Sequence, residues 1–280
     1  MAIETTFSAG IRRLYHYQRL NYDWLEGVLG HNRIRFSDPA AFNDPWDCSP
    51  NFDPGVIDDE ERRESYIQFL MESDRKHFRN SAERRRRMEE WLRSDPSIVR
   101  KLVEKISRGS KGAISGRFRV YCLSTDPASH PMWAHYADRH RGVCLEFGTD
   151  NDVFCAALQV QYQSDYRDLD LADETTEGNL LAFLRKPSTY DYENEYRLVA
   201  QERNLADPPD TLLTDDGFLT IPPRALKTII LGCEVDEDQC RKILEMVEHI
   251  GTGVDLKCAV RTLGRYDISI DAVTRFEAPV

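Results

Sequence analysis

Alternating and apolar runs of residues along the chain predict most of its strands. β-branched and aromatic residues mixed with polar ones are typical of strands, and they occur in LYHYQ, RIRFS, RFRVYCLS, GVCLEF, ALQVQYQ, NEYRLVAQ, GFLTIP, DLKCAVRTL and DISIDAV. The run LKTIILG is mostly apolar, as in a strand that is buried on both faces. We expect NEYRLVAQ and GFLTIP to pair as antiparallel neighbours. These segments predict a mainly antiparallel sheet.

Helices are predicted between these strands and after them. Asn21 can cap a helix over YDWLEGVL, which we expect to end at Gly30. Closer to the C-terminus, DEDQCRKILEMVEHI carries an apolar stripe at helical spacing, and Asp236 with Gln239 forms a capping-box pattern at its start. Shorter helices are expected within PMWAHYADRH and TTEGNLLAFLRK.

The segment 56–108 has a different character from the rest of the chain. Helix formers dominate there, and β-branched residues become rare. Ser81 can cap one helix, and Asp95 followed by Pro96 is a favourable start for another. We predict a helical insertion over residues 56–108 and a flexible return over residues 109–116. The chain then forms a single α+β domain over residues 1–280, with a split, mainly antiparallel sheet.

Composition and charge narrow the class of protein. Hydrophobic residues make up 41% and charged residues 30% of the 280 residues, which is typical of a soluble globular chain. No apolar run is long enough to span a bilayer, and the N-terminus lacks a secretory pattern, so we expect a cytoplasmic protein without membrane contact. A formal net charge of −11 argues against extensive nucleic-acid binding. The seven scattered cysteines are expected to be reduced thiols.

The segment TYDYENEYRLVAQ carries the densest charged pattern on a predicted strand. Glu193, Glu195 and Arg197 stand two residues apart, so on a strand their side chains would share one face. Such a face can belong to a functional site. The alternative is a salt-bridged, solvent-exposed face of an edge strand, which contributes little to stability.

The segment PMWAHYADRHRGVCLEF is the second candidate. Trp133 and Tyr136 can be core residues or can line a site, whereas His135 is the residue that we expect to be functional, since a functional histidine needs a sheltered position. His130, His135 and His140 are five residues apart, which does not place them on one helix face, so no metal site is expected. The phosphate-binding loop, the dinucleotide-binding glycine motif and the nucleophile elbow are absent from the sequence.

Several of these segments, in their order along the chain, resemble a known prokaryotic family. The pieces are LYHYQ, RIRFSDPAAFNDPWDC, YCLSTD, PMWAHYADRHRGVCLEF and YENEYRLV, and the family is known as domain of unknown function 2971. The resemblance covers most of residues 14–235 and is carried most specifically by FNDP, MWAHYA and E-x-E-Y-R. The family name by itself implies no chemistry.

More weakly, the order of the pieces resembles the ADP-ribosyltransferase fold. That fold has a His or Arg on an N-terminal strand, Ser-Thr-Ser or Tyr on a middle strand, and a catalytic Glu, often as Glu-x-Glu, where a later strand begins. Here YHYQ stands at the first motif with His16, LSTD resembles the middle motif with Ser124 and with Asp126 in place of the last serine, and ENE matches Glu-x-Glu. The first motif departs from the usual His-Gly-Thr, and a long helical segment precedes the middle strand.

This resemblance implies NAD as a substrate and no metal. Glu195 would then be the catalytic carboxylate that stabilises positive charge on the ribose, Glu193 its helper, and His135 a further catalytic residue. Aromatic rings would stack on the nicotinamide, and arginines would meet the pyrophosphate. The residues expected to bind the nucleotide are Tyr15, His16, Tyr17, Arg35, Ser37, Asn43, Asp44, Ser124, Trp133, Tyr136 and Arg197. Asn43 and Asp44 can instead form an Asx turn before Pro45.

Three functions remain open from the sequence. The leading hypothesis is an NAD-consuming enzyme that transfers ADP-ribose to an unknown macromolecular acceptor or hydrolyses NAD, an activity that in bacteria often serves a toxin or phage-defence role. The alternatives are a non-catalytic nucleotide-sensing or interaction module and a nuclease. The leading hypothesis expects Tyr15–His16, Ser124, His135 and Glu193–Glu195 to converge on one cleft. It also expects Glu195 to contribute little to stability, because Glu193 would repel it.

Overall fold

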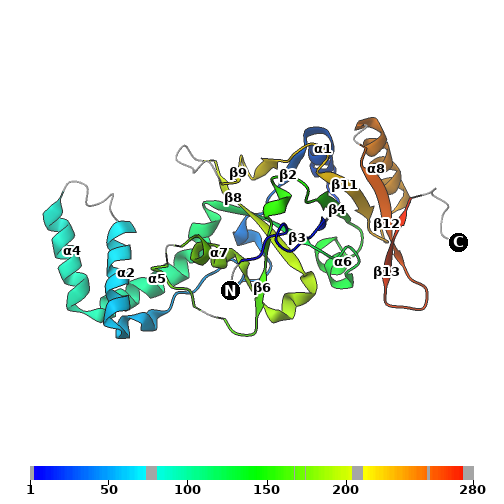
Figure 1. The fold of residues 1–280 in the computed structure, drawn as a ribbon. Coiled ribbons are helices and arrows are strands. Elements are labelled where there is room, and N and C mark those ends of the chain that lie inside the picture. Colours follow the sequence, from blue (N-terminus) through cyan, green and yellow to red (C-terminus); the bar gives the residue numbers. More distant parts are fainter. Residues whose placement is uncertain are drawn as a thin grey trace. The chain divides into compact units, whose positions relative to one another are not determined.

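The computed structural model describes residues 3–73, 81–166, 168–173, 175–203, 211–250 and 253–273. Its contacts divide the chain into two compact units (Figure 1). The first unit comprises Met1–Asp38, Phe118–Tyr162 and Lys186–Val280, and the second comprises Pro39–Arg117 and Gln163–Arg185. The expected single domain with a helical insertion over residues 56–108 stays a prediction. The second unit contains this segment and extends beyond it on both sides.

A nine-stranded sheet forms the centre of the first unit. Its strands follow one another in the order β13-β12-β11-β4-β1-β3-β8-β5, with β9 pairing with β8. Most neighbouring pairs are antiparallel, whereas β11–β12 and β8–β9 are parallel. The bounds of these strands are β1 Arg13–Gln18, β3 Phe118–Ser124, β4 Val143–Gly148, β5 Leu158–Gln159, β8 Glu195–Glu202, β9 Leu213–Thr214, β11 Leu226–Leu231, β12 Asp255–Arg261 and β13 Ile268–Ala272.

The two faces of this sheet pack against different helices. Apolar residues on one face of β4, β3, β8 and β11 form the main core with α1 (Tyr22–His31) and α8 (Glu237–Ile250), which Figure 1 shows beside each other. The other face packs against α6 (His130–Tyr136), whose Met132 and Trp133 belong to one hydrophobic cluster with Tyr17, Cys144 and Ile230. The alternation of side chains along each strand accounts for the two cores. The α+β class expected from the sequence is confirmed.

The helix signals of the first unit are confirmed with one correction. The Asn21 side chain accepts a hydrogen bond from the Trp24 amide, and Asp236 exchanges hydrogen bonds with Gln239 at the start of α8. However, α1 runs past Gly30 to His31, and the left-handed residue that ends it is Asn32, with a φ of 49°. Asparagine tolerates this conformation better than most residues with a Cβ, so it can replace the glycine that we expected.

Four short strands form two smaller sheets. β2 (Arg33–Arg35) pairs with β10 (Phe218–Thr220), and β6 (Gln161–Gln163) pairs with β7 (Arg185–Pro187). The expected pairing of NEYRLVAQ with GFLTIP is therefore wrong. Periodicity identifies both segments as strands, but it carries no information about which strand pairs with which.

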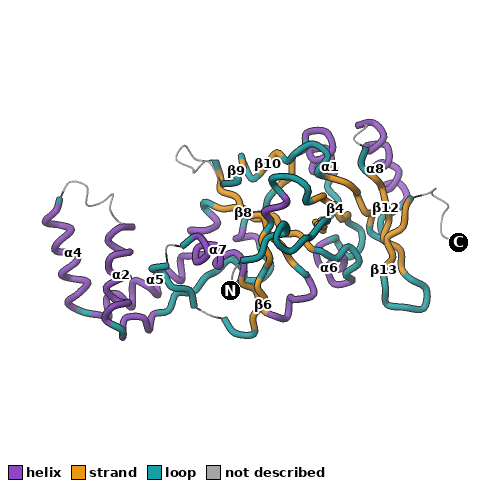
Figure 2. The backbone as a smooth tube through the Cα atoms, in the orientation of Figure 1, coloured by secondary structure: helices purple, strands orange, loops and turns teal. Residues whose placement is uncertain are grey.

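The second unit is mainly helical, as the purple segments in Figure 2 show. It has its own hydrophobic core. Its helices are α2 (Glu60–Ser73), α4 (Ala82–Ser94), α5 (Pro96–Ser115) and α7 (Thr176–Leu184), with 3-10 turns at η1 (Pro39–Ala41) and η2 (Pro54–Asp58). Ser81 and Asp95 cap α4 and α5 as predicted. The flexible return expected over residues 109–116 is wrong, because α5 continues to Ser115. Gly109 and Gly112 weaken a helix only modestly and do not end this one.

Two broader findings concern the described part of the chain. No described helix combines the length and the apolar character that a membrane-spanning segment needs. The seven cysteines are free thiols, in agreement with the prediction.

Candidate functional site

Three positions far apart in the sequence meet on neighbouring strands of the first unit. Ser124 at the end of β3 pairs directly with Tyr15 of β1 on one side and with Glu195 of β8 on the other. Directly opposed residues on paired strands point their side chains to the same face of a sheet. Tyr15, Ser124 and Glu195 therefore lie side by side on the face that packs against α6.

The same row continues across the other half of the sheet. Tyr15 also lies opposite Glu146 of β4, Glu146 lies opposite Thr228 of β11, and Thr228 lies opposite Asp255 of β12. We call these six aligned residues the polar row. Its members, from one end to the other, are Asp255, Thr228, Glu146, Tyr15, Ser124 and Glu195.

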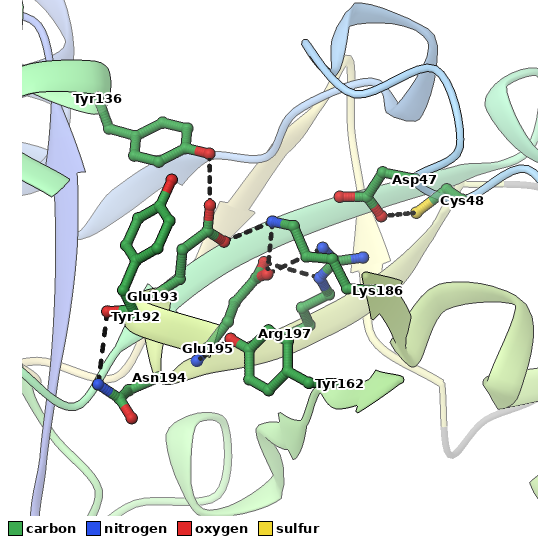
Figure 3. Close-up of polar contacts among 10 residues, drawn as sticks. All are labelled: Asp47, Cys48, Tyr136, Tyr162, Lys186, Tyr192, Glu193, Asn194, Glu195 and Arg197. Atoms are coloured by element: carbon green, nitrogen blue, oxygen red, sulfur yellow. Dashed lines mark hydrogen bonds and ion pairs between the residues drawn. The ribbon is translucent and has the colours of Figure 1, made fainter. Parts of the chain in front are cut away.

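At the Glu195 end of the row, charged side chains form a buried network (Figure 3). Lys186 of β7 donates hydrogen bonds to Oε2 of Glu193 and, at 3.0 Å, to Oε2 of Glu195. Arg197 binds Glu195 with two donors, Nε at 2.7 Å from Oε1 and Nη2 at 3.0 Å from Oε2. Arg197 is fully buried, and Glu193 and Glu195 are only 2% and 3% exposed.

Two tyrosines complete this network. Tyr136 of α6 donates its hydroxyl hydrogen to Oε1 of Glu193 at 2.7 Å. The hydroxyl oxygen of Tyr162 in β6 accepts the backbone N–H of Glu195 at 2.9 Å. We call the six residues the buried charge cluster. They are Tyr136, Tyr162, Lys186, Glu193, Glu195 and Arg197.

The junction between η4 (Ser188–Glu193) and β8 brings the two glutamates together. Glu193 is the last residue of the 3-10 helix, Asn194 is left-handed with a φ of 44°, and β8 begins at Glu195. The expectation that Glu193 lies on the strand is therefore corrected. The exposed edge-strand alternative is also wrong, because β8 lies between β3 and β5 and its charges are buried.

The two carboxylates differ in their electrostatic environment. Burial, and next the charge of Glu195, raise the pKa of Glu193 despite its contact with Lys186. Burial also acts to raise the pKa of Glu195, but Arg197 and Lys186 outweigh it and hold that pKa well below its usual range. Two carboxylates therefore meet two cations in the cluster. The expectation that Glu195 contributes little to stability stays a prediction, and the structure adds that Glu195 pairs with Arg197 and Lys186.

His16, the polar residue of the first motif, points to the opposite face from Tyr15. Its ring stacks on Tyr121 with 4.0 Å between ring centroids, and its Nδ1 lies 2.7 Å from the Cys122 carbonyl oxygen. Burial lowers the pKa of His16 to about 4. Tyr17 shares the face of Tyr15, and its hydroxyl donates to the Asp126 carbonyl at 2.6 Å. The structure thus separates His16 from Ser124 and Glu195.

The residues of the MWAHYA segment divide between three settings. Trp133 is fully buried, and its indole N–H donates to the Pro127 carbonyl at 2.9 Å, so it is a core residue. Tyr136 belongs to the buried charge cluster. His135 is exposed at the end of α6, which contradicts the sheltered position that we expected for it. On a helix, the side chain one position before Tyr136 points about 100° away from it.

The arginine and serine expected near the pyrophosphate lie in and after β2. Arg35 is exposed, and its guanidinium lies over the Trp24 ring at 5.3 Å from the centroid. Arg33 lies similarly over Phe218 at 4.3 Å. Ser37 is exposed and pairs through its main chain with Val120. None of these contacts joins the buried charge cluster.

Asn43 and Asp44 belong to the second unit. Asn43 is exposed, whereas Asp44 is 3% exposed and its Oδ1 accepts the Trp46 amide hydrogen at 2.9 Å. This contact is the Asx turn that we considered as an alternative to ligand binding.

Two cluster residues were not singled out from the sequence. Lys186 and Tyr162 lie on short strands in an irregular part of the chain, and a single lysine before a proline carries no pattern that distinguishes it from a surface lysine. Among the described residues, no group of three or more His, Cys, Asp or Glu side chains is arranged to hold a metal ion.

Comparison with known proteins gives one match. The model of a family described as "Protein of unknown function (DUF2971)" matches residues 132–198, which confirms the resemblance over this range. All six residues of the buried charge cluster lie within the matched range. No curated protein matches the chain. No solved structure matches it either.

Proposed function

We propose that the protein is an NAD-consuming enzyme of the ADP-ribosyltransferase type, which transfers ADP-ribose to a macromolecule or to water. The observation that supports this proposal most is the alignment of Tyr15, Ser124 and Glu195 on three neighbouring strands. The resemblance predicted that these three positions would converge together with His16, His135 and Glu193, and Tyr15, Ser124 and Glu195 are the aligned part of that set. The position of His16 on the other face means that Tyr15, and not His16, would represent the first motif at the site.

In this proposal Glu195 acts as a fixed negative charge beside the sugar. Cleavage of the nicotinamide–ribose bond develops positive charge on the ribose, and a carboxylate held in place stabilises that charge without reorganisation. Arg197 and Lys186 keep Glu195 ionised and oriented. Glu193, with its raised pKa and its hydrogen bond from Tyr136, is suited to accept a proton from the attacking group.

The direct test measures release of free nicotinamide from NAD by the full-length protein. Glu195→Gln keeps the shape of the side chain and removes its charge, and we expect release to fall by roughly 10²–10³-fold. Glu202→Gln on the same strand is the matched control, since Glu202 is also ion-paired, with Arg119 at 2.9 Å. If the wild-type protein releases no more nicotinamide than the Glu195→Gln variant, the proposal is wrong.

The second candidate is a nucleotide-sensing module without turnover. Both oxygens of Glu195 are engaged by Arg197 and Lys186. A carboxylate with a structural role would show the same contacts, and this favours a module without catalysis. Such a module would be stabilised by NAD in a thermal unfolding experiment and would release no nicotinamide. Stabilisation together with release supports the enzyme.

A further inference from the structure

A hollow of the first unit lies at the opposite end of the polar row from Glu195. It encloses about 560 Å³ and is formed by residues of β1, β4, β11, β12 and the turn before β11. Two polar residues of the row, Thr228 and Glu146, line it and are 2% and 8% exposed. Asp255, the last residue of the row, is an exposed part of its wall. We call this site the Thr228 hollow.

Positive charge predominates around this hollow. The cations that line it are Arg13, Arg224, Lys227 and Lys257, and the carboxylates are Glu146 and Asp255. Four cations therefore face two carboxylates, in a chain whose formal net charge is −11. One carboxylate is already engaged, because Arg13 Nε lies 2.8 Å from Glu146 Oε1. Outside the lining, Asp150 lies 3.8 Å from Lys227 Nζ.

Two irregularities of the backbone set the positions of two of these cations. Arg224 has a φ of 63°, a left-handed conformation that is costly for a residue with a Cβ. The register between β11 and β4 then shifts between Leu226 and Thr228, so Lys227 is the extra residue of a β-bulge. Bulges re-aim a side chain relative to its neighbours on the strand and are frequent beside functional sites.

Gly148 makes room for the bulged lysine. A Cβ at Gly148 would lie 2.5 Å from Cε of Lys227, so any larger residue would push the lysine away. The bulge and the glycine come from two different strands, β11 and β4, and both favour the same placement of the Lys227 side chain.

From this geometry we propose that the Thr228 hollow binds a phosphorylated sugar. The cations bind the phosphate through charge-assisted hydrogen bonds. The Thr228 hydroxyl donates to or accepts from the sugar hydroxyls, and the Glu146 and Asp255 carboxylates accept hydrogen bonds from them. A purely basic site would suit any anion, whereas the carboxylates select a ligand that also carries hydroxyl groups. The proposal does not rest on the proposed NAD chemistry, since Glu146 and Glu195 are three strand spacings apart, roughly 14 Å.

The test is calorimetric titration of the full-length protein with ribose 5-phosphate, inorganic phosphate and ribose. We expect ribose 5-phosphate to bind most tightly and ribose not to bind measurably. Lys257→Gln should weaken binding of ribose 5-phosphate by about tenfold or more, because a charge-assisted contact is lost. Thr228→Val should weaken the binding of ribose 5-phosphate and leave the affinity for inorganic phosphate unchanged. Lys242→Gln on α8, which removes the same charge outside the hollow, should have no effect.

Several outcomes would overturn the proposal. These are equal affinity for ribose 5-phosphate and inorganic phosphate, equal losses in the Lys257→Gln and Lys242→Gln variants, or the absence of saturable binding in a wild-type protein that melts cooperatively. Glu195→Gln separates this proposal from the NAD proposal. It should leave ribose 5-phosphate binding unchanged even where nicotinamide release is lost.

Discussion

Lys186 holds together two carboxylates that would otherwise repel each other in a buried setting. Its Nζ contacts Glu193 and Glu195, and Arg197 contacts Glu195. Loss of the lysine would therefore leave Glu193 without a cation and Glu195 with one. We therefore expect the loss of Lys186 to lower the free energy of unfolding more than the loss of either glutamate.

We predict that Lys186→Met destabilises the protein by about 3–5 kcal/mol, the usual cost of leaving a buried charge without its partner. The double variant Lys186→Met/Glu193→Gln should recover much of this loss, because a neutral glutamine needs no cation and can still accept the Tyr136 hydrogen bond. Chemical denaturation of the wild type, of both variants and of Glu193→Gln gives the four unfolding free energies of a double-mutant cycle. A loss below about 1 kcal/mol in Lys186→Met would show that the cluster is not an electrostatic unit.

His16 gives a prediction with a defined sign. Its pKa in the folded protein is about 4, against 6.5 for an ordinary histidine, so between these values the unfolded chain binds a proton that the folded protein does not. Stability should therefore fall as the pH decreases from 6.5 to about 4, by up to roughly 3 kcal/mol from this residue.

The measurement compares melting temperatures of the wild type and of His16→Phe across this pH range. The variant should lose stability less steeply, whatever its stability at neutral pH. His249→Gln, which removes an exposed histidine of α8, is the control and should follow the wild type. Parallel curves for the wild type and His16→Phe would contradict the assignment.

At the residue scale, the sequence predicts which side chains lie close together only where they follow the two-residue repeat of one strand. The two-residue spacing of Glu195 and Arg197 correctly placed them on one face of β8, and Ser124 was correctly assigned to a strand. Burial of Glu193 and Glu195 was not predictable, since it depends on Lys186 and Tyr162, which approach from other segments. His16 was misplaced because adjacent strand residues point to opposite faces, and the motif did not show which of Tyr15 and His16 faces the site.

Among the elements, the junction of η4 with β8 positions the cluster. Asn194 adopts the left-handed conformation there, and its neighbours on both sides are cluster residues. We predict that Asn194→Val destabilises the protein by about 1–2 kcal/mol, since a β-branched residue is strained at positive φ. Asn194→Gly is the control. It should be tolerated because glycine adopts this conformation freely. Equal melting temperatures of the two variants would show that the conformation of residue 194 is not required.

Capping residues were the most reliable sequence signals for elements. Asn21, Ser81, Asp95 and Asp236 all make the predicted contacts, because a cap is decided by residues within one turn. Strand partners were the least reliable. β10 pairs with β2 instead of β8, and this choice depends on the packing of the whole unit rather than on either segment.

At the scale of the whole molecule, the main feature is the division into two units. The chain passes from the first unit into the second and returns twice, over Pro39–Arg117 and over Gln163–Arg185. At the ends of the first of these segments, Ser37 and Val120 exchange two main-chain hydrogen bonds of 2.8 and 3.0 Å, and at the ends of the other, β6 pairs with β7. The chain ends created by removing the second unit would therefore already be close together.

We predict that a chain with short Gly/Ser linkers in place of Pro39–Arg117 and Gln163–Arg185 melts cooperatively and keeps the near-ultraviolet circular dichroism of a packed core. Deletion of residues 56–108 alone is the comparison. It should aggregate, because it leaves Phe52 and Leu171 without the helices that they pack against. A two-linker chain without a cooperative transition would show that the first unit does not fold by itself.

The position of β1 has a consequence for how the chain is made. The ribosome releases this strand before its neighbours in the sheet, β3 and β4, which end at Ser124 and Gly148. Until then, both edges of β1 offer unpaired backbone groups to any passing strand, a recognised route to aggregation. The helices that separate β1 from β3 in the sequence emerge during this interval. During synthesis, β1 therefore stays without its partner strands until β3 and β4 have been made. Conditions that slow elongation should lower the soluble yield of the protein.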